Sequence, residues 1–174
     1  MADNQLIPFG GKSPKLGKNA YVAPGARLVG DVTLGDDSCA LFNAVIRADI
    51  APVVIGCSTN IQDNVTIHVS ENQGVTVGDS VTIGHNAVLH ACTVEDGSLI
   101  GMGAIVMDGA HIRRNTIVAA GALVPPGKEY PEAALLVGAP AHVSRSLTPV
   151  EISEIRANAE SYVKMGLRDI VWVV

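Results

Sequence analysis

Aliphatic residues recur along the chain at intervals of six, and this spacing is its dominant pattern. They run unbroken from Val22 to Ile46 and again from Ile100 to Val124, with shorter runs between. A period of six fits neither an amphipathic strand, which alternates every two residues, nor a helix, which repeats every 3.6 residues. It is typical of a hexapeptide parallel β-helix, in which a short strand ends at a corner every six residues and three units complete one coil. We therefore predict a mainly β fold of stacked coils.

The period slips at three places, and each slip predicts an irregularity of the coil. Three extra residues enter around Ala51-Pro52 and four enter within Ser70–Gln73, so we expect loops there. The interval from Leu89 to Ile100 is one residue short. Binding and catalytic residues often lie on loops that a rigid scaffold positions. Further along, the segment from Lys128 to Ala139 is predicted to be an irregular crossing, with Pro125, Pro126, Pro131 and Pro140 as the breakers in and around it.

A helix is predicted after the coils. Thr148-Pro149-Val150-Glu151 matches a capping box with proline at the first helical position. Apolar and aromatic residues then follow at helical spacing, namely Ile152, Ile155, Ala159, Tyr162 and Val163. We predict a β-helix domain over 1–145, which includes an N-terminal cap segment, and a helix over 146–174 packed on it, as one domain overall. Whether the apolar segment Asp169–Val174 contacts a neighbouring molecule is left open.

Composition narrows the class of protein. The 174 residues are 48% hydrophobic, yet they include one Trp, three Tyr and two Phe, which suits a narrow bore filled by aliphatic side chains. The formal charge of −5 argues against nucleic-acid and anionic-membrane partners. No apolar run approaches the ~20 residues needed to span a bilayer. The three cysteines form no CxxC pair, and the N-terminus has no signal-peptide pattern, so we expect a cytoplasmic protein whose cysteines are wall residues of the coil.

Two histidines are predicted to stack. His68 and His90 each follow an inward aliphatic residue in successive coils, so strand alternation points both outward, with rungs ~4.8 Å apart. Arg47 holds the same position one coil earlier and completes the column. Two imidazoles at this spacing can converge on one ion with Zn–N bonds of ~2.0–2.1 Å. His111 and His142 have no partner in this construction.

A third histidine falls on another face of the coil. His85 is separated from His90 by a corner, so roughly 10 Å or more of chain intervenes. A threefold trimer of parallel coils would bring it to the other two, with each interface holding one metal between two histidines of one subunit and one of the next. Asp63 occupies the position of His85 one coil earlier, beside Gln62. Both are also common kinds of turn residue. Arg47 and Asp49 can equally be an interface ion pair.

The collected motifs resemble those of the γ-class carbonic anhydrases and their bacterial relatives. The resemblance covers nearly the whole chain and rests on Arg47-Ala48-Asp49, Asn60-Ile61-Gln62-Asp63-Asn64, His68, Gly84-His85-Asn86-Ala87-Val88-Leu89-His90, Gly101-Met102-Gly103-Ala104 and Val137-Gly138-Ala139-Pro140-Ala141. It implies a left-handed β-helix that assembles as a homotrimer, with Zn²⁺, Fe²⁺ or Co²⁺ at each interface. It implies His68, His85 and His90 as ligands. Gln62 would then position a metal-bound hydroxide, while Arg47, Asp49 and Asp63 order the interface and the site.

The chain departs from that family's pattern at two places. Ile50 stands where the founding members have an acidic residue, and the short stretch from Val69 to Gly74 replaces a long acidic loop that carries a proton-shuttle glutamate. Glu71 can take the shuttle role or be a solvated loop residue. Tyr162 and Asn158 of the terminal helix would reach the pocket, as similar residues do in the family. The departures bear on turnover and not on metal binding.

The hypothesis that follows is reversible hydration of CO2 to bicarbonate by a metal-bound hydroxide. One alternative is acyl-CoA chemistry, because many hexapeptide-repeat proteins are acyltransferases and relatives of this branch are linked to thioesterase activity. Another is a metal-binding homologue with little activity. A measurement of metal content distinguishes a transferase from a carbonic anhydrase and from a metal-binding homologue. A CO2 hydration assay run beside a panel of acyl-CoA substrates then distinguishes the remaining hypotheses.

Overall fold

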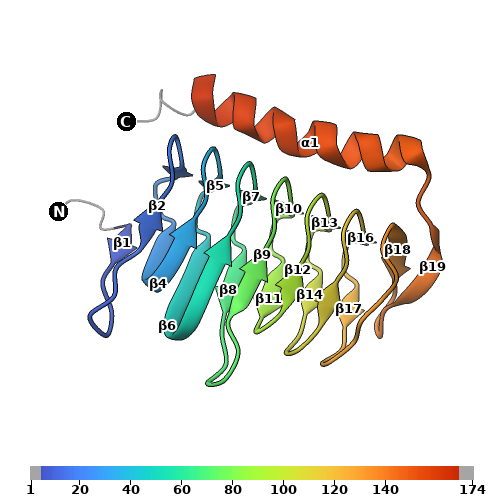
Figure 1. The fold of residues 1–174 in the computed structure, drawn as a ribbon, viewed down its shortest axis with the longest axis horizontal. Helices are drawn as coiled ribbons and strands as arrows, with labels where there is room; N and C mark the ends of the chain where they lie inside the picture. Colours follow the sequence, from blue (N-terminus) through green and yellow to red (C-terminus); the bar gives the residue numbers. More distant parts are fainter. Residues whose placement is uncertain (1–4, 169–174) are drawn as a thin grey trace.

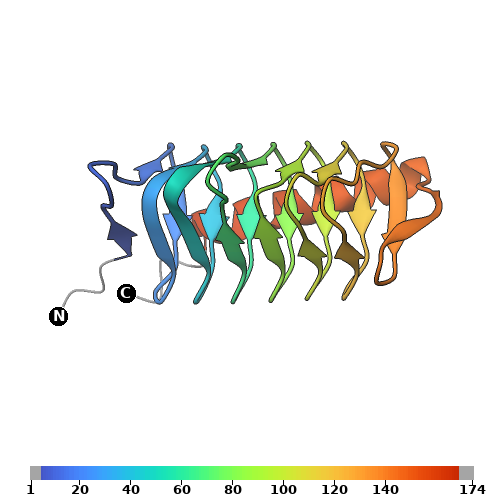
Figure 2. The same cartoon turned by 90° about the horizontal axis from the view of Figure 1, so that it is seen from below.

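The computed structural model describes residues 5–168, which form a parallel β-helix with one long helix lying along it (Figure 1). The predicted β-helix is confirmed. Strands of successive coils pair in parallel, and the one antiparallel pair among residues 5–168 joins Ala134–Val137 to His142–Ser146 after the last coil. Seen from below, the corners of successive coils line up in rows (Figure 2). We name the three walls of the coil faces A, B and C.

Faces A and B belong to one 11-stranded sheet, because β4 (Arg27–Leu34) and β6 (Val45–Ile55) run around the corner between them. Face A also carries β1 (Leu6–Ile7), β8 (Thr66–His68), β11 (Val88–His90), β14 (Ile105–Val106) and β17 (Leu123–Val124). Face B also carries β2 (Lys15–Leu16), β9 (Val75–Val77), β12 (Thr93–Val94) and β15 (His111–Ile112). Face C is a separate 8-stranded sheet made of β3 (Tyr21–Val22), β5 (Cys39–Ala40), β7 (Asn60–Ile61), β10 (Thr82–Ile83), β13 (Leu99–Ile100), β16 (Ile117–Val118), β18 (Ala134–Val137) and β19 (His142–Ser146).

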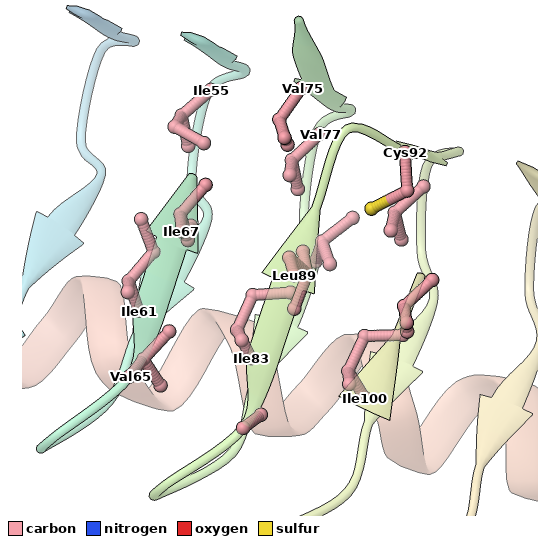
Figure 3. Packing of buried hydrophobic residues seen from close by; sticks show 14 of the residues in the cluster. Ile55, Ile61, Val65, Ile67, Val75, Val77, Ile83, Leu89, Cys92 and Ile100 are labelled. Atoms are coloured by element: carbon pink, nitrogen blue, oxygen red, sulfur yellow. The ribbon is translucent and has the colours of Figure 1, made fainter. Parts of the chain in front are cut away.

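The core is a column of aliphatic side chains inside the bore. Ile46, Ile67 and Leu89 occupy the same position in successive coils of face A, and all three are fully buried. Ile61 and Ile83 stack in the same way on face C (Figure 3). Removing this continuous apolar surface from water is the main stabilising contribution. It also fixes the register, because a slip of one residue would turn the inward side chains outward.

Asparagine residues form the corner that precedes face A. Asn64 and Asn86 both have a φ of 60°. Asparagine tolerates this left-handed conformation better than most residues. The Asn86 amide donates to the carbonyl of Asp63 in the coil before. His85 directly precedes Asn86, so the turn fixes its backbone.

Two sequence predictions need correction. The three extra residues around Ala51-Pro52 do not form a loop that leaves the coil. They bulge within the continuous strand β6, between Ala48 and Val53. The predicted irregular crossing from Lys128 to Ala139 contains strand β18. Its Leu136 pairs with Val118 and is fully buried, so the need to fill the last coil outweighs the proline signal.

The predicted loop at Ser70–Gln73 and the predicted start of the helix are both present. The four-residue insertion is a tight turn closed by paired amide–carbonyl hydrogen bonds between Ser70 and Gln73. The helix α1 (Pro149–Arg168) begins with the predicted capping box. The Thr148 amide donates to the Glu151 carboxylate at 2.9 Å, and the Glu151 amide donates to the Thr148 hydroxyl at 3.3 Å.

Helix α1 runs back along face C and contacts β5, β7 and β10 (Figure 1). Ile155 and Ala159 are its buried residues against the coil. The domain limits at 145 and 146 stay a prediction, and Asp169–Val174 lies outside the described residues. Among residues 5–168, no helix combines the length and the hydropathy needed to cross a membrane.

Candidate metal centre

His68 and His90 lie together on face A. They pair directly in register, and Arg47 pairs with His68 one coil earlier, so the predicted column exists. Nδ1 of His68 lies 3.1 Å from Nε2 of His90, and the ring centroids are 5.1 Å apart at an interplanar angle of 53°. The two imidazoles therefore face each other through one nitrogen each.

The other nitrogen of each ring faces an aspartate. Nε2 of His68 is 3.1 Å from Oδ1 of Asp49, and Nδ1 of His90 is 2.7 Å from Oδ1 of Asp108. A carboxylate accepts the N–H of a neutral imidazole, which leaves the lone pair on the opposite nitrogen. If both rings are held in this way, two lone pairs point at each other across 3.1 Å. That arrangement is favourable only with a positive charge between them, which a proton on one ring or a cation supplies.

The pair fits a metal ion. Two nitrogens bound to one tetrahedral ion at ~2.0–2.1 Å are about 3.3–3.4 Å apart, close to the observed 3.1 Å. Imidazole nitrogen is a donor that suits zinc and iron. Within residues 5–168 no three His, Cys, Asp or Glu side chains converge as a complete ion-binding group.

Asp49 is placed by the bulge in β6. Gly30, opposite the bulge on β4, has a φ of +76°, and a Cβ built on it would lie 2.3 Å from the Ala48 carbonyl oxygen. Arg47 forms an ion pair with the Asp49 carboxylate. Burial raises the pKa of Asp49, but hydrogen bonds from His68, its own amide and Arg47 outweigh burial and lower the pKa overall. Asp49 is therefore a charged acceptor for His68.

His85 lies at the corner between faces C and A. Its Nδ1 is 2.9 Å from Oδ2 of Asp63, and its amide donates to Oε1 of Gln62 at 3.2 Å. Gln62 is 5% exposed, and its Nε2 donates to Oδ1 of Asn60 at 3.2 Å. Hydrogen bonds thus fix both the backbone at His85 and the amide of Gln62.

A cavity of about 330 Å³ opens beside His85 and Gln62, between face C and α1. Apolar residues form much of its wall, including Leu99, Met102 and Ile117. Helix α1 contributes Tyr162 and Asn158 to the cavity wall, and the Thr82 hydroxyl donates to Oδ1 of Asn158 at 3.1 Å. Burial raises the pKa of Tyr162, and the nearby Cys39 and Asp63 raise it further.

Glu71 is not brought into this arrangement. It lies exposed in the turn that follows His68, and within residues 5–168 it makes no hydrogen bond or ion pair with the other candidate residues. Ile50, which directly follows Asp49, is 57% exposed.

The structure adds Asp108, which sequence reasoning missed. Asp108 lies 18 residues beyond His90, in the next coil. Because Leu89 pairs with Val106, this coil is one residue shorter than three full units, so Asp108 falls one position past the column of His68 and His90, in the turn after β14. The six-residue period therefore did not point to it. His111 also has a partner that the sequence construction did not foresee, because its Nε2 is 2.8 Å from Oε1 of Glu95. This second pair lies on face B, away from the column of His68 and His90.

Two of the three cysteines are wall residues of the coil, as predicted, whereas Cys57 lies in an exposed turn and corrects the prediction. Cys39 and Cys92 are buried, and burial raises the pKa of each thiol to about 12. Thiols with such pKa values stay protonated and are poor nucleophiles.

Comparison with known proteins identifies the family. The chain is 42% identical over 161 residues to the carbonic anhydrase of Geobacillus kaustophilus, an alignment that covers 92% of this chain and 88% of that protein. It is 39% identical over 161 residues to gamma carbonic anhydrase 2, mitochondrial, of Arabidopsis thaliana, covering 89% of this chain. The chain belongs to the gamma carbonic anhydrase family. It spans 58% of the length of the Arabidopsis relative. No family model matches the chain.

Solved structures of proteins that are not named as gamma carbonic anhydrases share this fold. A hexapeptide transferase family protein from Anaplasma phagocytophilum superimposes with a TM-score of 0.91 at 36% identity, covering 96% of this chain and 98% of that one. The β-helix alone therefore does not decide the reaction, which depends on the side chains it carries.

Proposed function

We propose that this protein is a γ-type carbonic anhydrase that reversibly hydrates CO2 to bicarbonate. The metal, with Zn²⁺ as the first choice and Fe²⁺ or Co²⁺ as alternatives, would be held between adjacent subunits of a homotrimer. His68 and His90 of one subunit and His85 of the next would be its ligands. The observation that carries the proposal is the 3.1 Å approach of the His68 and His90 nitrogens, each ring having a carboxylate on its far side.

The position of His85 supports a shared site. It lies across a corner from the other two histidines, and its own carboxylate, Asp63, accepts from Nδ1. Its Nε2 is then the nitrogen with a lone pair available to an ion. In a ring of three parallel coils, face A of one subunit meets the corner of the next that bears His85.

A metal in such a site supplies a nucleophile at neutral pH by lowering the pKa of a bound water from 15.7 to about 7. The protein's own residues would do the rest. Gln62, fixed by Asn60 and the His85 amide, would orient that nucleophile by a hydrogen bond. The apolar cavity beside it would receive CO2, which has little affinity for polar walls.

The remaining candidates order the site and handle the proton. Arg47 and Asp49 would fix His68, and Asp63 would fix His85. Tyr162, whose pKa is raised, stays protonated at neutral pH and would act as a hydrogen-bond donor. Glu71 lies in the exposed turn that follows His68 in the chain, and it would pass the proton to solvent.

Elemental analysis of protein purified without oxygen, followed by stopped-flow CO2 hydration, tests the proposal. We expect one metal per subunit and hydration activity that His90→Ala abolishes together with metal binding. His111→Ala is the matched control, because it removes a histidine on face B whose ring also faces a carboxylate, that of Glu95, and should change neither. Activity unaffected by His90→Ala would refute the assignment.

Acyl-CoA chemistry is the second candidate, because the chain is 36% identical to a protein of the hexapeptide transferase family. An acyltransferase or thioesterase would turn over acyl-CoA substrates, and a transferase would do so without bound metal. A third candidate is a metal-binding homologue with little activity. Metal content and a CO2 assay run beside an acyl-CoA panel distinguish all three. We also propose a cytoplasmic location, which the reduced cysteines support.

A further inference from the structure

We propose that Asp108 is a positioning residue of the metal centre: it selects the tautomer of His90 that can bind the ion. The inference rests on the proposed function, since it concerns the same site. It adds a residue that neither the motifs nor the comparisons assign.

The three histidines share one arrangement. Each has one aspartate on one ring nitrogen, at 3.1 Å for His68 with Asp49, 2.9 Å for His85 with Asp63 and 2.7 Å for His90 with Asp108. The shortest of the three contacts is the one to Asp108. Carboxylates behind metal-binding histidines fix the tautomer and the ring orientation and make the ligand more basic.

The tautomer matters most at His90. Its Nε2 faces Nδ1 of His68 at 3.1 Å. If His90 carried its proton on Nε2, it would donate to His68, and this hydrogen bond would close the position where an ion would lie. With Asp108 accepting from Nδ1–H, the proton is held on the far side of the ring and Nε2 keeps its lone pair. Asp108 therefore keeps the lone pair of His90 Nε2 available to a cation that lies between His90 and His68.

Asp108 differs from three other aspartates at the coil corners. The carboxylates of Asp36, Asp79 and Asp96 accept backbone amides of a neighbouring coil, from Lys18, Cys57 and Asp79 respectively. These contacts hold the corners together. The Asp108 carboxylate instead accepts from the His90 side chain, and its side chain is 45% exposed. Its role is thus directed at the histidine, and its removal should leave the coil folded.

The test measures Zn²⁺ affinity by competition with a chromophoric chelator, on full-length wild type, Asp108→Ala and Asp108→Asn. We expect Asp108→Ala to weaken binding about 10–100-fold, the usual effect of losing such a carboxylate. Asp108→Asn keeps an acceptor oxygen without the charge, so its affinity should fall between the two. The visible absorption of the Co²⁺-loaded protein should change with Asp108→Ala, because the orientation of one ligand is no longer fixed.

Glu95→Ala is the matched control. It removes one of the two carboxylates beside His111 on face B, the other being Glu129, and with it an acceptor of the Arg114 amide. This variant shows the effect of losing a carboxylate away from His68 and His90, and it should leave Zn²⁺ affinity and the Co²⁺ spectrum unchanged. Circular dichroism and thermal unfolding of each variant establish that the coil is intact. Wild-type affinity in both folded Asp108 variants would overturn the role of Asp108 alone. A wild-type protein that binds neither Zn²⁺ nor Co²⁺ would overturn the proposed function and this inference with it.

Discussion

His68 and His90 are 22 residues apart in the chain, yet their facing nitrogens lie 3.1 Å apart. One coil of three hexapeptide units accounts for most of that separation, and the four-residue insertion at Ser70–Gln73 accounts for the excess. Because the insertion is a self-contained turn outside the wall, the histidines remain one rung apart.

Deleting Ser70–Gln73 should therefore leave the histidine pair intact. Val69 and Gly74 would then be joined, which restores the six-residue interval between Ile67 and Val77, so we expect unchanged Zn²⁺ affinity. If Glu71 is the proton shuttle, the deletion and Glu71→Gln should both lower CO2 hydration in dilute buffer, and added imidazole should restore it. Loss of Zn²⁺ binding in the deletion would mean that the turn helps to form the site.

Mixing two inactive variants tests whether adjacent subunits share each site. His85→Ala and His90→Ala should each lack bound Zn²⁺ and activity. After joint unfolding and reassembly at equal amounts, an interface is complete when its His68 and His90 come from one variant and its His85 from the other. Random assembly of a threefold ring makes about a quarter of the interfaces complete. Recovery of that share of Zn²⁺ and activity is expected, whereas no recovery would exclude shared ligands.

The glycine opposite the β6 bulge should resist substitution. Gly30→Ala combines a φ of +76° with a Cβ only 2.3 Å from the Ala48 carbonyl oxygen. Backbone strain of this kind costs about 1–3 kcal/mol, and relief of the clash would shift the bulge that places Asp49. Gly103→Ala is the control, with a φ of +66° but nothing within 4 Å of its Cβ. Urea unfolding should show the larger loss for Gly30→Ala, and equal losses would mean that the close contact is unimportant.

The start of α1 should be sensitive to acid. Arg145 lies 2.6 Å from Glu151 and lowers its pKa to about 2, together with hydrogen bonds from Thr148. A depressed pKa contributes stability that is present above the ordinary value of 4.5 and is lost as pH falls toward 2. The difference in Tm between wild type and Glu151→Gln should be constant from pH 7 to 5 and vanish near pH 2. Arg145→Ala should behave in the same way. A difference that persists at pH 2 would contradict the ion-pair explanation.

The sequence predicted those parts of the site that the six-residue period controls. The column of Arg47, His68 and His90 follows from counting rungs, and so does the pairing of Asp63 with His85. Asp108 was missed because it lies in a turn, where the period does not determine the direction of a side chain.

Two local predictions failed for a similar reason. A bulge and a loop both add residues to the period, so the counting could not tell which of them lay at Ala51-Pro52. Strand β18 was hidden by flanking prolines, although Leu136 continues the aliphatic column of face C. In both places the packing of neighbouring coils decided the structure, and a single sequence does not display that packing.

Helix α1 should affect how this protein unfolds. A bare stack of coils, each touching only its neighbours, can fray from either end. Here the chain leaves the last coil and returns to lie against β10, β7 and β5, so Tyr162 and Met165 pack beside Cys39 and Leu41 of an early coil. Helix α1 therefore links the last coil to an early one, and loosening the late coils must also release that early coil. Unfolding should then be a single cooperative transition and not a stepwise loss of coils from one end.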